Sequence, residues 1–397
     1  MVPPPPVSPA LIMATAAASF GHLACWVMAY NQVHGRIQRH DLVRRLSRAF
    51  VTATLLIPVA WCGYSYFAGT PLLVSWSATS HPLPVRGTVV LYQLMAGYIL
   101  LCWLFQRLVT THRGRQTVLQ TQTIDLANPP ESPPLFLENA PWFMRVPGNQ
   151  IAQLEITEKQ LRLPHLPRAL DGLTIAHLSD LHFEGKLPRA YFEQVIDQTN
   201  ALAADLVAIT GDLVDRPECL NWIDTTLNRL QSRYGRYFVL GNHDLRLGDV
   251  APLRQMLTSA GAIDLGVSQH HLQINDHSIY LAGNEKPWFP LADTMTKHAN
   301  SCAESDFSIL LSHSPDEVNW ARQRGFDLML AGHTHGGQIR FPILGPVIAP
   351  SQSGVKYAGG TFFQPPTMLH ISRGISGLFP IRWNCPPEIT RLVLKAE

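Results

Sequence analysis

The chain of 397 residues is 46% hydrophobic and has a formal net charge of +2 at pH 7. The charge is uneven, since residues 1–150 hold ten Arg, no Lys and four Asp or Glu, which leaves residues 151–397 with −4. Nucleic-acid binding requires a basic surface beside the active site, so the acidic half with the candidate chemistry argues against a nuclease. Six scattered cysteines without a CxxC pair predict neither a disulfide framework nor a zinc knuckle and fit a reducing compartment.

Three apolar segments in residues 1–109 predict a membrane anchor of about three helices. Ala10–Tyr30, Phe50–Leu73 and Gly87–Phe105 can each cover the roughly 20 residues that a bilayer crossing needs. Aromatic residues gather toward the segment ends, as they do at membrane interfaces: Trp26, Tyr30, Trp61, Tyr64, Tyr66 and Trp103. The alternative is a buried helical domain of a soluble protein.

The start of the chain has a second interpretation as a cleaved signal peptide, because Ala16–Ser19 resembles a cleavage site. A proline run without a basic residue precedes this site, which argues against cleavage. If the segment is retained, the positive-inside rule places two arginine-containing regions in the cytoplasm. These arginines are Arg36, Arg39, Arg44, Arg45, Arg48, Arg107, Arg113 and Arg115. The prediction is a multi-pass protein of the inner (cytoplasmic) membrane with a cytoplasmic catalytic half.

Residues 110–150 predict a proline-rich linker. Six prolines lie between Asn128 and Pro147, a density that neither a helix nor a central strand tolerates. The alternation of apolar and polar residues in Gln150–Leu161 then predicts the first strand of a domain that covers residues 151–397.

From Leu173 onward, short apolar runs alternate with helical patterns, which is typical of an α/β domain. The predicted buried strands are Leu173–Ala176, Leu206–Thr210, Tyr237–Leu240, Ser308–Leu311 and Leu328–Ala331. The predicted helices are Pro188–Ala204, Pro217–Arg233, Gly248–Ala260 and Pro315–Arg324. Hairpin strands are expected at His270–Ala282, Gln338–Phe341, Met368–Ser372 and Thr390–Leu394. Together these elements predict mixed sheets in a two-sheet sandwich with helices outside.

Polar residues follow each of the five predicted buried strands. They are Asp180 and His182, then Asp212 and Asp215, then Asn242, His243 and Asp244, then His313, and last His333 and His335. Ligands of open α/β sheets bind beyond the carboxyl ends of the strands, so these side chains are expected to converge. Asp180 and Asp212 could instead be helix caps, Asn242 could be a turn residue, and His313 could be a loop histidine with its hydrogen bonds satisfied. Capping does not explain five such strand ends in succession.

The order of these motifs resembles the calcineurin-like metallophosphoesterase superfamily. The motifs are Asp-x-His, Gly-Asp-x-x-Asp, Gly-Asn-His-Asp, a lone His and Gly-His-x-His, and they extend from Leu173 to about Gln338. The resemblance implies a four-layer αββα sandwich with a dinuclear metal site. It also implies one metal held by Asp180, His182 and His335, a second held by Asn242, His313 and His333, and a bridging Asp212.

The resemblance further implies a reaction. Two divalent ions would activate a hydroxide that attacks a phosphodiester or pyrophosphate bond. His243 would donate a proton to the leaving group with Asp244 as its orienting partner, while Asp215 would orient a metal ligand or His243. Oxygen and nitrogen ligands without a thiolate suit Mn, Fe or Zn, of which we expect Mn first.

The segment after the metal motifs resembles a bacterial, membrane-associated subgroup, one branch of which cleaves UDP-2,3-diacylglucosamine in lipid A biosynthesis. The subgroup implies a lipid bilayer and a lipid-linked phosphate substrate as partners; no protein partner is evident. Arg373 or Arg340 could contact a substrate phosphate, with a surface salt bridge as the alternative. Apolar residues of the late loops could form an acyl-chain groove or simply pack in the core: Phe341, Pro342, Ile343, Leu344, Val347, Ile348, Phe362 and Phe363.

We therefore expect a membrane-anchored, metal-dependent phosphohydrolase that acts on a lipid-linked substrate. One alternative is a membrane-anchored phosphodiesterase for a small soluble substrate or another phospholipid. A different alternative is a metal-binding membrane module without turnover. The His243-Asp244 pair argues against the module, because metal binding alone needs no proton donor.

Overall fold

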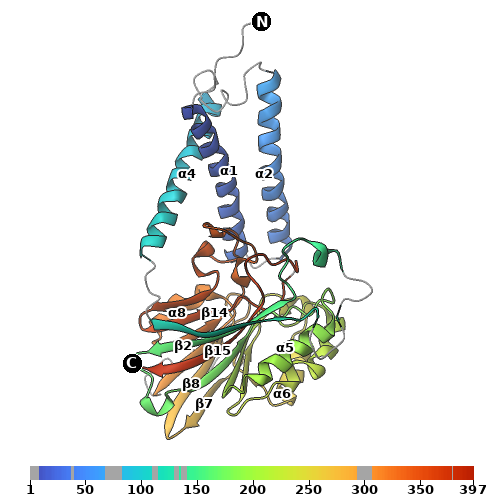
Figure 1. Ribbon diagram of the computed structural model, residues 1–397, viewed down its shortest axis with the longest axis vertical. Helices are drawn as coiled ribbons and strands as arrows, with labels where there is room; N and C mark the ends of the chain where they lie inside the picture. Colours follow the sequence, from blue (N-terminus) through green and yellow to red (C-terminus); the bar gives the residue numbers. More distant parts are fainter. Residues whose placement is uncertain are drawn as a thin grey trace. The chain divides into compact units, whose positions relative to one another are not determined.

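A computed structural model describes residues 9–36, 40–67, 83–109, 115–128, 134–135, 141–292, 306–377 and 379–397 (Figure 1). The chain divides into two compact units, Met1–Thr111 and His112–Glu397.

The first unit contains three long helices, one for each predicted apolar segment: α1 (Pro9–Arg36), α2 (His40–Phe67) and α4 (Leu83–Val109). Within the described residues, Ile12–Arg36 is the one helix long and apolar enough to cross a membrane, and the apolar part of α4, Gly87–Cys102, is shorter. The finding supports one membrane span, whereas the predicted multi-pass arrangement is not supported by it. The predicted interfacial side chains of Trp61, Tyr64, Tyr66 and Trp103 lie outside the described residues.

The second unit is built on two large sheets and a short two-stranded ribbon. The first sheet has the order β1-β2-β15-β3-β4-β5-β6. Its strands are β1 (Gln116–Asp125), β2 (Gln153–Leu163), β15 (Glu388–Ala396), β3 (Thr174–Leu178), β4 (Leu206–Thr210), β5 (Arg236–Val239) and β6 (Ile263–Asp264). The second has the order β13-β14-β10-β9-β8-β7. Its strands are β13 (Gly360–Gln364), β14 (Thr367–Ile371), β10 (Leu328–Ala331), β9 (Phe307–Ser312), β8 (His277–Asn284) and β7 (Gln269–Ile274). The ribbon pairs β11 (Arg340–Phe341) with β12 (Gly345–Pro346).

The two large sheets pack face to face and carry helices on their outer faces (Figure 1). Because successive side chains of a strand point to opposite faces, β4 contributes to two cores. Val207 and Ile209 pack toward α5 (Arg189–Ala201) and α6 (Ala251–Ser259), whereas Leu206 and Ala208 pack against the second sheet. The other face of that second sheet packs against α8 (Val318–Gln323). The predicted αββα sandwich is confirmed.

The five predicted buried strands are β3, β4, β5, β9 and β10. The first three pair in parallel, as do β8, β9, β10 and β14, so their carboxyl ends lie at common sheet edges. One predicted helix differs, because Pro217–Arg233 forms two 3₁₀ helices, η4 (Pro217–Thr225) and η5 (Leu227–Arg229). Thr226 separates them with φ −123° and ψ −96°, which no helix accommodates.

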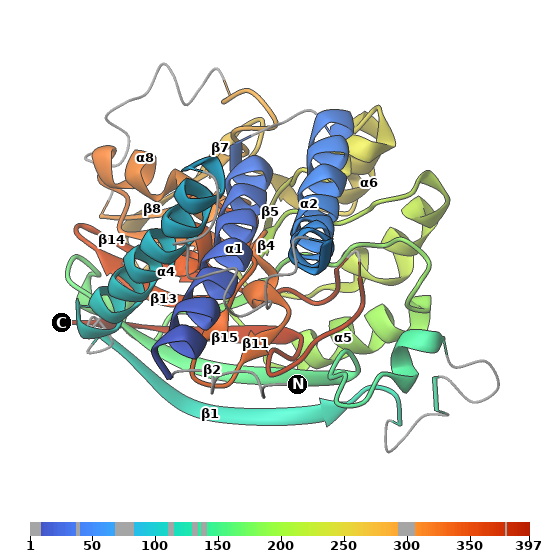
Figure 2. The same cartoon turned by 90° about the horizontal axis from the view of Figure 1, so that it is seen from above.

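The predicted linker 110–150 contains a strand, which corrects that part of the sequence-based division. β1 pairs antiparallel with β2 and forms an edge of the first sheet (Figure 2). Most of its side chains are exposed, so the sequence Gln-Thr-Val-Leu-Gln-Thr-Gln-Thr-Ile-Asp lacks the alternation that a half-buried strand displays. Much of the proline-rich part, residues 129–133 and 136–140, lies outside the described residues.

Candidate metal centre

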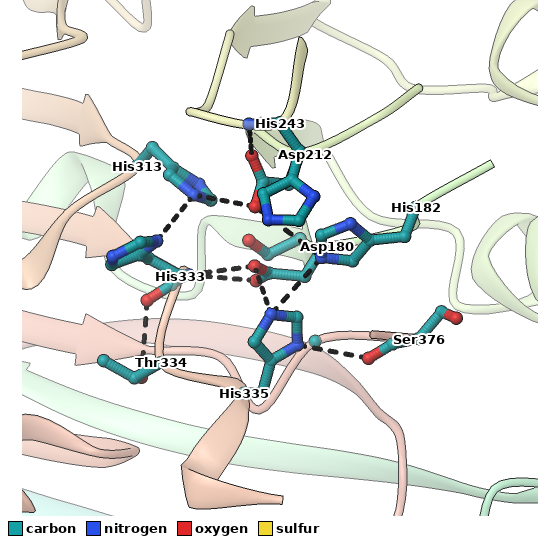
Figure 3. A network of polar contacts seen from close by, with 12 residues as sticks. Asp180, His182, Asp212, His243, His313, His333, Thr334, His335 and Ser376 are labelled. Atoms are coloured by element: carbon teal, nitrogen blue, oxygen red, sulfur yellow. Dashed lines mark hydrogen bonds and ion pairs between the residues drawn. The ribbon is translucent and has the colours of Figure 1, made fainter. Parts of the chain in front are cut away.

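The loops that follow five parallel strands bring the predicted ligands together. Asp180 and His182 follow β3, Asp212 follows β4, and Asn242 follows β5, all in the first sheet. From the second sheet, His313 follows β9, and His333 and His335 follow β10. The sandwich thus places side chains that are up to 155 positions apart in the chain around one centre (Figure 3).

One group of donor atoms consists of Asp180, His182, Asp212 and His335, and these atoms all lie within 4.8 Å of one another. His182 Nε2 is 3.3 Å from His335 Nε2 and 3.6 Å from Asp212 Oδ2. His335 Nε2 is also 3.5 Å from Asp180 Oδ1. Two imidazoles and two carboxylates therefore face a common point.

A second group surrounds His313. Its Nε2 atom is 3.2 Å from Asp212 Oδ2, 3.2 Å from Asn242 Oδ1 and 3.1 Å from His333 Nδ1. Asp212 Oδ2 is thus close to donors of both groups. This is the position that a carboxylate shared by two cations requires.

The other ring nitrogens of three histidines fix the direction of these donors. His313 Nδ1 donates to the carbonyl of Thr210 at 2.7 Å, and His335 Nδ1 donates to the carbonyl of Ser376 at 3.1 Å. His182 Nδ1 donates to Asp215 Oδ2 at 2.7 Å. Because a carbonyl oxygen and an ionised carboxylate can only accept, Nδ1 carries the proton, and in the neutral ring the Nε2 lone pair points into the centre.

The charges of the site favour cations. Burial alone would lower the pKa of His182 and His313, but nearby carboxylates, Asp215 and Asp212 foremost, raise both values to about 9. Burial alone would raise the pKa of Asp212, but His313, His243 and His182 outweigh it and hold it well below its ordinary value. Carboxylates that draw protons onto buried imidazoles also favour divalent cations. With the convergent nitrogen and oxygen donors, this charge balance fits a pair of metal ions.

The backbone of the ligand loops is held in a conformation that L-residues rarely adopt. Asp180, His182, Asp212, His333 and His335 have φ between 50° and 70°. Such strain persists where the surroundings impose it and is typical of functional sites. Glycines next to the ligands allow the close approach: a Cβ at Gly241 would lie 2.3 Å from Asp212 Oδ1, and one at Gly332 would lie 1.8 Å from Ser179 Oγ.

The prediction for His243 needs one correction. Asp215, rather than Asp244, is the carboxylate that orients it, because His243 Nδ1 lies 2.5 Å from Asp215 Oδ1. Asp215 therefore contacts both His243 and the candidate ligand His182, so both alternatives expected for it describe its position. Asp244 is buried and accepts the backbone N–H groups of Asp212, Leu213, Val214 and Gly241 at 2.8–3.1 Å. Burial, followed by the charge of Asp212, raises the pKa of Asp244 to about 7.

Arg373 and Arg340 are mainly engaged with the protein itself. Arg373 donates to Glu388 at 3.0 Å and to Glu155 at 2.5 Å, so the ion-pair alternative describes it. Arg340 Nε donates to the carbonyl of Gly336 at 2.7 Å. Neither contact favours the predicted binding of a substrate phosphate.

Two residues at the centre were missed by sequence reasoning. Trp288 packs against His313 and His333, with ring centroids 5.3 and 4.8 Å apart. Arg382 is fully buried and donates to the carbonyl groups of His335, Arg373 and Ser376. For Arg382, the only signal in the sequence was its position as a single arginine in the apolar stretch Phe-Pro-Ile-Arg-Trp.

The αββα sandwich and two donor groups sharing one carboxylate define a metal-dependent phosphoesterase. The calcineurin-like phosphoesterase family matches residues 173–337, and the chain belongs to this family. The chain is therefore a hydrolase of phosphoester bonds, and the residues of the centre could hold the two divalent ions that this family uses.

Three relatives illustrate this membership. The chain is 30% identical over 251 residues to the uncharacterized metallophosphoesterase YkuE of Bacillus subtilis, covering 61% of this chain and 86% of that protein. It is 30% identical over 230 residues to phosphodiesterase YaeI of Escherichia coli, covering 55% of this chain and 81% of that protein. It is 27% identical over 289 residues to the UDP-2,3-diacylglucosamine pyrophosphatase LpxG of Chlamydia muridarum, covering 59% of this chain and 88% of that protein.

Proposed function

We propose that the protein hydrolyses a phosphodiester or pyrophosphate bond of a lipid-linked substrate, such as UDP-2,3-diacylglucosamine, at the cytoplasmic face of the inner membrane. The observation that carries the hydrolytic part is the position of Asp212 Oδ2, 3.2 Å from His313 Nε2 and 3.6 Å from His182 Nε2. A carboxylate shared by two imidazole-rich groups offsets the repulsion between two adjacent cations.

In this proposal Asp180, His182 and His335 would hold one divalent ion, Asn242, His313 and His333 would hold the other, and Asp212 would be shared by both. When bound, such ions supply Lewis acidity toward the phosphoryl oxygens and a water of lowered pKa. Mn is the first candidate by ligand type, and Fe or Zn also suits these donors.

His243 is the proposed proton donor for the leaving group. Its Nδ1 atom contacts Asp215, and its backbone N–H donates to Asp212 Oδ1 at 2.7 Å, so the ring has a fixed position beside the shared carboxylate. Its ring centroid is 4.5 Å from that of His182. This arrangement leaves His243 Nε2 available for a leaving oxygen.

The lipid-linked substrate is supported by two independent features. The chain carries an apolar helix, Ile12–Arg36, of sufficient length to cross a membrane. LpxG, a relative by sequence, is a pyrophosphatase of UDP-2,3-diacylglucosamine, a nucleotide sugar that carries acyl chains. The arginines between and after the apolar segments support a cytoplasmic catalytic unit by the positive-inside rule.

The decisive experiment is cleavage of UDP-2,3-diacylglucosamine by the full chain, purified in detergent with added Mn²⁺, with UMP as the measured product. We expect UMP release, abolished in Asp212→Ala. Absence of UMP, with retained hydrolysis of an aryl phosphodiester, would remove this substrate and favour a small soluble diester or another phospholipid. The similarity to YaeI, a phosphodiesterase, supports this second candidate.

A metal-binding module without turnover is distinguished by His243→Ala. The proposed function predicts that this variant binds Mn²⁺ as the parent does and loses turnover. Hydrolysis at the parental rate would remove His243 from the mechanism. Absence of hydrolysis in the parent chain on both substrates would favour the module.

A further inference from the structure

Beside the metal centre lies a group of exposed, large apolar side chains, here termed the apolar rim. Its members are Ile339, Phe341, Ile343, Leu344, Ile348, Phe379 and Trp383. Ile343 is 75% exposed and Phe379 is 68% exposed. Elsewhere in the described part of the second unit, large exposed apolar residues number four: Val118, Leu119, Trp142 and Val267. Exposed apolar groups concentrated in one place mark an interaction surface.

Two segments form the rim and are joined directly to each other. The backbone N–H of Arg340 donates to the carbonyl of Trp383 at 2.9 Å, and the N–H of Trp383 donates to the carbonyl of Gln338 at 3.0 Å. The rings of Phe341 and Trp383 meet edge to face at 5.8 Å. Gln338 Nε2 donates to the carbonyl of Phe379 at 2.9 Å. The two segments of the rim are therefore joined by backbone, side-chain and ring contacts.

The rim is also continuous with the metal centre. Its first segment begins four residues after His335, and its second follows Ser376, whose carbonyl accepts His335 Nδ1 (Figure 3). A Cβ at Gly377 would lie 2.6 Å from Gln338 Nε2 and 3.5 Å from His335 Nδ1. Whatever binds the rim is thus brought next to the hydrolytic site.

Residues 338–387, the part of the chain that contains the rim, differ in charge from the rest of residues 151–397. Residues 338–387 contain four Lys or Arg and no Asp or Glu, whereas the remainder of residues 151–397 contains 17 Lys or Arg and 25 Asp or Glu. Lys186 Nζ lies 5.5 Å from the centroid of the Phe379 ring and also pairs with Glu184 at 3.0 Å. Of the four basic residues in 338–387, Arg382 is buried and Arg373 is paired with Glu155 and Glu388, which leaves Arg340 and Lys356 as the cations of this segment. A segment without acidic residues that combines these cations with exposed aromatic and aliphatic side chains complements an anionic lipid surface.

We propose that the apolar rim inserts into the interfacial layer of an anionic phospholipid bilayer, so that the metal centre opens at the lipid surface. Trp and Phe side chains favour this layer, and basic residues add attraction to anionic headgroups. The apolar N-terminal helix would tether the unit to the same bilayer, which makes the docking intramolecular and raises the effective concentration of lipid. The inference concerns the surface alone and does not depend on which phosphoester is cleaved.

The test uses the full chain reconstituted into vesicles of phosphatidylethanolamine and phosphatidylglycerol. A fluorophore is attached in Ile343→Cys and, as a matched control, in Val267→Cys, which is 58% exposed outside the rim. The signal of the identically treated parent chain is subtracted, because the chain contains native cysteines. Quenching by phospholipid that carries a nitroxide near its headgroup then reports contact with the bilayer.

We expect quenching at position 343 to exceed that at position 267 by about threefold or more, and to fall by half or more when phosphatidylcholine replaces phosphatidylglycerol. Phe379→Cys should behave like Ile343→Cys. Equal quenching at positions 343 and 267 would overturn the proposal. Equal quenching with bismaleimide crosslinks between Ile343→Cys chains would assign the rim to a second copy and would also overturn it. Neither result bears on whether the protein hydrolyses the proposed substrate, which the UMP assay measures separately.

Discussion

Arg382 and His335 donate hydrogen bonds to the same backbone oxygen, the carbonyl of Ser376, at 2.5 and 3.1 Å. Arg382 also donates to the carbonyls of His335 at 3.3 Å and Arg373 at 2.6 Å. A fully buried guanidinium thus ties the loop that carries a metal ligand to the loop that orients that ligand's ring. Loss of a partner that orients a metal ligand typically lowers metal affinity or activity by about 10- to 100-fold.

Arg382→Met should weaken Mn²⁺ binding by about 10-fold or more, because His335 loses its fixed direction. Calorimetric titration of the purified full chain measures the affinity. Arg391→Met is the control, since Arg391 is a half-buried arginine that pairs with Glu158 at 2.5 Å and not with the ligand loops. Should Arg382→Met fail to fold, Arg382→Lys retains the charge but cannot reach three carbonyls, and we expect intermediate affinity. Parental affinity in a folded Arg382→Met would contradict this role.

Asp215→Asn should reduce kcat on any cleaved phosphodiester by about 100-fold, because His243 loses the carboxylate that orients it and stabilises its protonated form. The same carboxylate accepts a hydrogen bond from Arg246 at 2.8 Å and from His182, so some loss of metal affinity accompanies the change. Steady-state kinetics at saturating Mn²⁺ separate the two effects. A kcat that recovers fully with added metal would show that Asp215 acts only through His182.

Asp244→Ala should destabilise the fold, because four backbone N–H groups in a buried loop lose their common acceptor. A single buried group left without a partner costs about 1–3 kcal/mol, so we expect a loss of at least about 3 kcal/mol. Thermal unfolding of the full chain in detergent should show a clear decrease in Tm, in contrast to Asp215→Asn. An unchanged Tm together with lost turnover would restore the role that the sequence predicted for Asp244.

The acid sensitivity of the fold should depend on Glu388, which lies 2.6 Å from Lys159 Nζ and also accepts from Arg373. Burial alone would raise the pKa of Glu388, but Arg373 and Lys159 outweigh it and hold the pKa well below its ordinary value. The unfolded chain then binds the proton more readily, so the stability contributed by Glu388 is fully present above about pH 4.3 and is lost as the pH falls below that value.

Glu388→Gln should therefore be less stable than the parent at neutral pH and should lose less further stability between about pH 5 and pH 3. Unfolding followed by circular dichroism across this range checks the slope. Glu158→Gln is the control, because Glu158 forms a half-buried pair with Arg391. Parallel slopes in the parent and in Glu388→Gln would assign the acid sensitivity to other carboxylates.

The sequence by itself determined most of the sandwich and the candidate ligands. Each buried strand is a short apolar run, and each ligand follows such a run directly, so local pattern was sufficient for β3, β4, β5, β9 and β10. The strand β1 was not predicted, because an exposed edge strand has no apolar face to produce the alternation of apolar and polar residues. The division of Pro217–Arg233 into two 3₁₀ helices depends on the backbone of Thr226, which no periodicity reports.

Only the tertiary structure decided which side chains act on each other. Asp215 and Asp244 are equally plausible partners of His243 in the sequence, and the nearer one along the chain was the wrong choice. The packing of β4 beside β5 turns Asp215 toward the imidazole and leaves Asp244 beneath the backbone of the β4 loop. Likewise, apolar residues in the late loops could equally have packed in the core, and the fold places several of them at the surface. Local pattern encodes which residues form buried strands, whereas contacts between loops arise when strands distant in sequence pair and their ends meet at one edge.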